Sequence, residues 1–222
     1  MPALWAPDAE GARAMTPTVI TQAELIAILA AEPNAEIDID IDATEELRAT
    51  IVGAPTLTLH GNTRLSVIIK EAPPPLMGTA PALIALDKSH LRVDVWKGRP
   101  WINAQDNAGV AIRCHEASAP NATLEGHSRA AVECYDNSAP TLHVDRRSHA
   151  AIGCHDHSEP VIRACGHSVV DIHTFDDSRP FVSAFDDSAP EINIHDRGMP
   201  SVRTHDNRVP VIHDYRTNKP QE

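Results

Sequence analysis

The sequence predicts an all-β fold: a parallel β-solenoid of about 20 residues per coil, with two strands per coil and an N-terminal α-helical cap. Three observations predict it. A ten-residue repeat runs without a gap from Gly109 to Asn218, matching is better at a lag of twenty residues than at ten, and apolar residues alternate inside each repeat. Roughly nine coils at about 4.8 Å each make a rod on the order of 40 to 45 Å long.

The N-terminal part of the chain departs from the repeat. Thr21 and Glu24 form a T-x-x-E capping box ahead of the apolar run LIAILAA, and Pro33 closes the segment. We therefore expect a flexible tail over residues 1–15 and a capping helix over 16–35. The cap protects the strand edge of the first coil, whereas the C-terminal sequence TNKPQE offers no comparable cover.

Each ten-residue block indicates a strand followed by a corner. Positions 2, 4 and 6 are mostly apolar, as in a strand that buries one face. Asp-x-Ser follows at positions 8 to 10, and these side chains can bond to their own backbone. Ten prolines at position 2 place that position at a corner or a strand start. The solenoid is expected over 36–218, with a loop insertion at 73–79 and a tail at 219–222.

The lag of twenty residues decides how many blocks make one coil. Cysteine occupies position 6 of alternate blocks, at Cys114, Cys134 and Cys154, and position 7 of the same blocks is a ring each time. A two-block coil stacks these like residues over one another, and a three-sided coil of thirty residues does not. The three cysteines are expected to be buried as small apolar residues, with Cys165 as the reactive thiol.

Two columns along one edge form the predicted binding surface. Position 7 of alternate blocks presents stacked rings, and position 8 presents acids that accept backbone N–H bonds in their own corner. The rings are His115, Tyr135, His155, Phe175, His195 and Tyr215, and the acids are Glu116, Asp136, Asp156, Asp176 and Asp196.

Thirteen histidines raise the alternative of a metal site. Imidazole and carboxylate columns suit zinc or a similar ion, and an acidic column suits calcium. Stacking of rings is the favoured interpretation, because a phenylalanine within the column cannot ligate a metal, and no cofactor is expected. The residues of the alternative metal site are His155, Asp156, His157, His195, Asp196, His205 and Asp206.

Composition excludes several classes of function. The net charge of −12 argues against direct binding to nucleic acid or to an anionic membrane. The N-terminus shows no secretory signal, no run approaches the length of a membrane span, and the few cysteines suit a reducing compartment, so a cytoplasmic protein is expected. No catalytic motif appears, so the protein is expected not to be an enzyme.

The blocks resemble the decapeptide repeats, roughly A-x-V-x-A-x-D-x-S, of solenoid-like proteins from bacteria and their phages. RAAVECYDNSAP and FVSAFDDSAP carry the resemblance, together with the entry segment TQAELIAILAAEPNAEIDIDIDA, and it covers about residues 16–218. The resemblance implies the fold and a bacterial or phage origin, but almost no activity. The chain is more distantly similar to pentapeptide-repeat proteins in its twenty-residue coil, acidity and size, although its unit is ten residues and not five.

The expected function is a non-enzymatic, rigid scaffold or protein-binding module. Its expected partner is another protein or a second copy, including a homo-oligomer formed through the uncapped C-terminal end. Two alternatives stay open. One is an acidic DNA mimic that inhibits a DNA-binding protein, and the other is a metal-binding or self-assembling structural solenoid.

Overall fold

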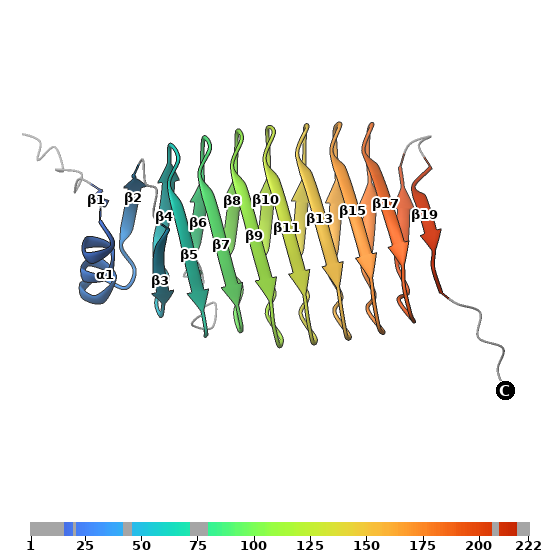
Figure 1. The fold of residues 1–222 in the computed structure, drawn as a ribbon, viewed down its shortest axis with the longest axis horizontal. Helices are drawn as coiled ribbons and strands as arrows, with labels where there is room; N and C mark the ends of the chain where they lie inside the picture. Colours follow the sequence, from blue (N-terminus) through green and yellow to red (C-terminus); the bar gives the residue numbers. More distant parts are fainter. Residues whose placement is uncertain (1–15, 20, 42–45, 72–79, 206–208, 217–222) are drawn as a thin grey trace, which may run out of the picture.

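The protein is a rod of two parallel β-sheets placed face to face, as predicted (Figure 1). Its structure, a computed structural model, describes residues 16–19, 21–41, 46–71, 80–205 and 209–216. Each coil contributes one strand to each sheet, so strands two apart in the chain are neighbours in the sheet. The expected tails and the 73–79 loop lie outside the described residues.

The ten-stranded sheet holds the first strand and all even-numbered strands. In order these are β1 (Thr18–Val19), β2 (Glu36–Asp40), β4 (Thr56–His60), β6 (Ala82–Ala85), β8 (Trp101–Ala104), β10 (Asn121–Leu124), β12 (Thr141–Val144), β14 (Val161–Ala164), β16 (Phe181–Ala184) and β18 (Ser201–Thr204).

The nine-stranded sheet holds the remaining strands. They are β3 (Leu47–Ile51), β5 (Arg64–Ile69), β7 (His90–Val95), β9 (Gly109–Cys114), β11 (Arg129–Cys134), β13 (His149–Cys154), β15 (Val169–Thr174), β17 (Ala189–Ile194) and β19 (Val211–Asp214).

The register confirms the two-block coil. From β9 to β17 the position-4 residues pair as Val or Ile over Ile, twenty residues apart, and all are buried. Strands β5 and β7 also pair in register, Arg64 opposite His90, across the insertion between them. Buried Val, Ile, Leu, Ala and Cys side chains from both sheets fill the narrow space between the sheets. The core is therefore one continuous column that each coil extends.

A positive φ marks every corner that the structure describes between His60 and Gly198. At each of these corners except the one after Trp96, whose block is one residue short, the N–H of position 10 donates to the carbonyl of position 7, as from Ser118 to His115 at 3.1 Å. At these corners position 8 takes φ between 49° and 60° where it is not glycine, and at the short corner the positive φ, 113°, falls on Gly98. Asp and Gly are the residues that tolerate this left-handed conformation best, which accounts for their frequency at position 8.

Arg146→Gly is expected to stabilise the protein by about 1 kcal/mol, because Arg146 holds φ at 60° and a glycine removes the strain of its Cβ. Gly126 and Gly166 already occupy the same place in the adjacent coils, with φ of 75° and 64°. Urea denaturation measures the change. Asp136→Gly is the matched control and should show no gain, since it also removes a carboxylate that accepts the Glu116 N–H at 2.9 Å.

The serine at position 10 differs from its expected role. We expected its hydroxyl to bond to the corner's own backbone, and Ser148 does so, donating to the Asp145 carbonyl oxygen. For eight others the expectation is wrong, because the side chain points inward and its hydroxyl has no partner within the described chain: Ser89, Ser118, Ser128, Ser138, Ser158, Ser168, Ser178 and Ser188. Ala108 fills the same place, so this position selects small size.

The N-terminal end is covered, as predicted. Helix α1 spans Gln22–Ala31, and the Thr21 hydroxyl accepts the Glu24 N–H at 3.2 Å. Leu25 is buried beneath the helix. The side-chain amide of Gln22 donates to the Arg48 carbonyl and accepts the Arg48 N–H, both at 2.7 Å. Gln22 thus replaces a missing strand beside β3, and β1 covers the edge of β2.

The C-terminal end is open in the described part of the chain. Strand β18 pairs only with β16, and β19 pairs only with β17, so the outer edge of each lacks a neighbour there. The inward isoleucine of the repeat is 0% exposed at Ile192 and 50% exposed at Ile212. Val211 and Val209 are exposed beside it. This end presents apolar core and unpaired strand edge to its surroundings.

Candidate binding edge

The predicted ring column forms one continuous stack along the corner that follows the nine-stranded sheet. Consecutive rings are nearly parallel, with centroids 4.4 to 5.3 Å apart, close to the coil spacing. Trp96 extends the stack by one ring beyond His115. The repeat pattern could have predicted this ring, because Trp96 is position 7 of a block that is one residue short.

A second, partial row of histidines lies beside the stack on position 5. The Nδ1 atom of His173 lies 3.4 Å from Nε2 of His195, and the two rings are stacked at 5.7 Å. His213 stacks in the same way on Tyr215 at 6.0 Å. The Nε2 atom of His155 lies 3.2 Å from Oε2 of Glu133. The edge therefore presents ring edges with polar atoms between them.

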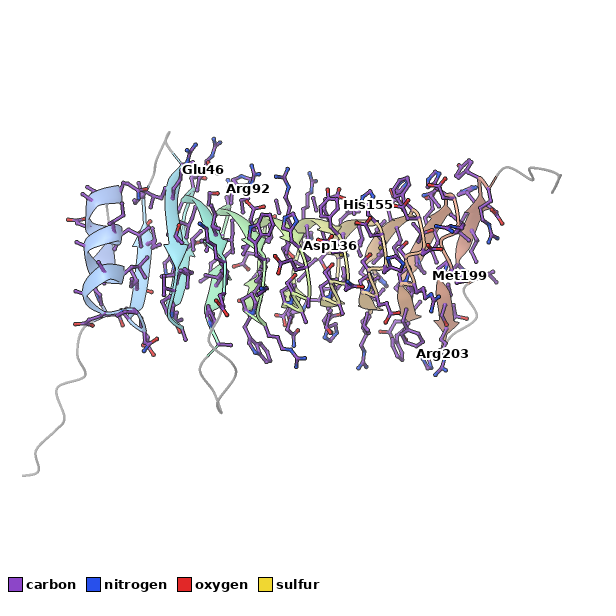
Figure 2. All side chains as sticks on the ribbon, turned by 90° about the horizontal axis from the view of Figure 1, so that it is seen from below. Glu46, Arg92, Asp136, His155, Met199 and Arg203 are labelled. Atoms are coloured by element: carbon purple, nitrogen blue, oxygen red, sulfur yellow. The ribbon has the colours of Figure 1, made fainter. Side chains whose placement is uncertain are left out.

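The acid column joins one coil to the next. Asp136 accepts the Glu116 N–H at 2.9 Å, Asp156 accepts the Asp136 N–H at 3.0 Å, and Asp176 accepts the Asp156 N–H at 3.2 Å. Our expectation of bonds within one corner is therefore corrected: each of these carboxylates reaches the corner of the preceding coil. The bonds to N–H groups offset the repulsion between neighbouring carboxylates. Figure 2 shows Asp136 and His155 near the middle of the rod.

The structure does not gather the residues of the alternative metal site. Among the described residues, no group of three or more His, Cys, Asp or Glu side chains is placed to hold an ion. His157 pairs with Asp177 at 4.0 Å, and His205 lies at the opposite corner, stacked on Phe185 at 4.1 Å. Asp206 lies outside the described residues.

The cysteines take the places that the repeat predicts. Cys114, Cys134 and Cys154 are free and buried in register, and Cys165 is free and half-buried. Hydrogen-bonding contacts with the thiols of Cys114 and Cys154, together with burial, raise the pKa of Cys134 well above its ordinary value. Burial shields all three cysteines from reagents as long as the coils stay closed.

Negative charge is unevenly distributed along the chain. Ten of the 31 acidic residues, but only one of the 19 basic residues, lie within the first 46 positions. The remaining chain is close to balanced, with basic side chains on both sheets. In Figure 2, Arg92 on the nine-stranded sheet and Arg203 on the ten-stranded sheet point to opposite sides of the rod.

No helix in the described part of the chain is long and apolar enough to cross a membrane. Comparisons with protein-family models, with curated proteins and with solved structures found no match for this chain.

Proposed function

We propose that the protein is a non-enzymatic, rigid scaffold that acts by binding protein, and that its first partner is a second copy of itself. The observation that carries this proposal is the C-terminal end of the rod, where β18 and β19 each have a free outer edge in the described part of the chain. Its two strand edges belong to two facing sheets, so a complete partner must offer two matching edges at the same separation. The C-terminal end of another copy offers both.

The covered N-terminal end limits how the copies associate. A head-to-tail polymer needs a free strand edge at each end, and α1 with Gln22 and β1 occupies the N-terminal one. The association of two C-terminal ends about a two-fold axis is closed instead. We therefore favour a dimer over a filament. The alternative of a self-assembling solenoid is then restricted to a closed pair of copies.

The ring and acid edge is the surface that we propose for a different protein partner. Its rings repeat at every coil from Trp96 to Tyr215, and it combines apolar ring area with polar atoms that accept and donate hydrogen bonds. The alternative of a DNA mimic receives less support. Several carboxylates of the acid column already accept backbone N–H groups, and much of the net negative charge lies within the first 46 positions.

Ile212→Asp is expected to convert a dimer into a monomer, because it places a carboxylate at the centre of the proposed contact. Size-exclusion chromatography with light scattering, over a wide concentration range, measures the mass. Val161→Asp is the matched control: Val161 is an exposed valine on the body of the rod, and its variant should remain dimeric. A wild-type protein that stays monomeric at all concentrations contradicts self-association.

A further inference from the structure

A basic hollow lies at the corner opposite the rings. Two adjacent coils place four side chains around a space of about 370 Å³: His127, Arg129, Arg147 and His149. His127 and Arg129 stand where one coil enters β11, and Arg147 and His149 stand where the next coil enters β13. Arg129 lies directly opposite His149 in the sheet.

The backbone beneath the hollow is held by ladder hydrogen bonds. The Arg147 N–H donates to the Gly126 carbonyl at 3.1 Å, and the His149 N–H donates to the Ser128 carbonyl at 3.0 Å. The residues on the preceding coil are held in the same way, with Arg129 donating to Ala108 at 2.9 Å. The backbone from which the four side chains extend is therefore held in place, which lowers the entropy cost of binding a ligand between them.

No ion pair that the structure describes neutralises this cluster. None of its four side chains takes part in an ion pair within the described residues, and no acidic residue lines the hollow. Arg113, on the same sheet, shows the contrasting arrangement, because its cross-strand neighbours are Asp94 and Glu133. Basic side chains brought together without a counter-charge repel one another, and an anion removes that repulsion.

We propose that this hollow binds an oxyanion, in the form of a phosphate or sulfate group on a ligand. Arg129 and Arg147 each offer a planar guanidinium that can contact two oxygens of such a group. His127 and His149 each offer at least one N–H donor in either charge state. Hydrogen bonds from all four satisfy the oxygens of one tetrahedral anion.

A second hollow continues the basic surface toward the N-terminal end. It measures about 360 Å³, shares Arg129 with the first, and adds Arg64, His90 and Arg92 around a floor of small residues, Gly109, Ala111 and Ala131. Arg92 lies 3.7 Å from Asp94 and Glu46 also lines this hollow, so its charge is partly offset. A ligand with two linked anionic groups extends into it, and the first hollow holds the stronger contact.

The test is isothermal titration of the full chain at low salt with inorganic phosphate, sulfate, pyrophosphate and phenyl phosphate. We expect saturable binding of one anion per chain, tighter for pyrophosphate than for phosphate. Arg129→Gln and Arg147→Gln should each weaken binding by about tenfold, the size expected for one charged hydrogen-bonding partner. Phosphate binding above sulfate assigns the site to phosphate groups, and the reverse order assigns it to sulfate groups.

Arg113→Gln is the matched control, since it removes the same charge from the same sheet outside the hollow. Binding that falls equally in the control and in the two hollow variants overturns the proposal, because the anion then responds only to overall charge. The proposal is also overturned if none of the four probes binds saturably. Thermal melts of each variant establish that the solenoid is intact, so that weakened binding is not read from an unfolded chain.

Discussion

Leu25→Asp is expected to lower the free energy of unfolding by about 3 kcal/mol and to change how the protein associates. Leu25 is 0% exposed beneath the capping helix, so the substitution forces a carboxylate against the first coil or lifts α1 away. A lifted helix also withdraws Gln22 from the N–H and carbonyl of Arg48. The described part of the rod then has a free strand edge at both ends, and copies can add to one another in a row.

Thermal denaturation and light scattering measure the two effects of this change. Ile26→Asp is the control on the same helix, because Ile26 is 55% exposed. It should stay within about 0.5 kcal/mol of wild type and keep the same mass. If Leu25→Asp melts like wild type and forms no larger species, the helix does not protect the end.

Phe175→Ala is expected to lower the free energy of unfolding by about 2 kcal/mol. Phe175 stacks on His155 at 4.8 Å and on His195 at 4.7 Å, and each ring pair contributes about 0.5 to 1.5 kcal/mol beyond the area that it buries. Alanine breaks the column into two shorter stacks. Urea denaturation followed by circular dichroism measures the loss.

Trp101→Ala separates stacking from the simple loss of a large side chain. Trp101 is larger than Phe175, lies 59% exposed on the ten-stranded sheet and has no ring partner within the described residues. Its variant should lose less than about 0.5 kcal/mol. Equal losses in both variants would show that stacking contributes nothing specific along the edge.

Much of the fold follows from the repeat, because each coil places the same residue type in the same surroundings. Ile152 and Ile172 lie twenty residues apart because they occupy the same inward position in successive coils. For the same reason both are buried and paired with each other. The same logic placed the buried cysteines and the stacked rings. Thr21 and the apolar run after it predicted the helix that covers the first coil.

The repeat did not predict which neighbour each polar group would contact. A column of aspartates is visible in the sequence, but the bond from Asp156 to the preceding coil depends on a positive φ that no pattern states. The sequence pattern suggested that serine at position 10 bonds to the backbone of its turn. In eight corners the structure uses only its small size, and the hydroxyl has no partner within the described residues. The basic hollow was missed because Arg129 and Arg147 occupy different positions of the repeat and meet only across a corner.

Because the coils stack in register, insertions and deletions in the gene can change the length of the rod. Between β9 and β17 every residue of the nine-stranded sheet faces its counterpart twenty positions away. A duplication or deletion of twenty residues therefore adds or removes one coil and leaves both ends and both edges unchanged. A change of ten residues moves every later block to the other sheet and carries the rings after it to the opposite edge. Evolution can lengthen this molecule in one step only in whole coils.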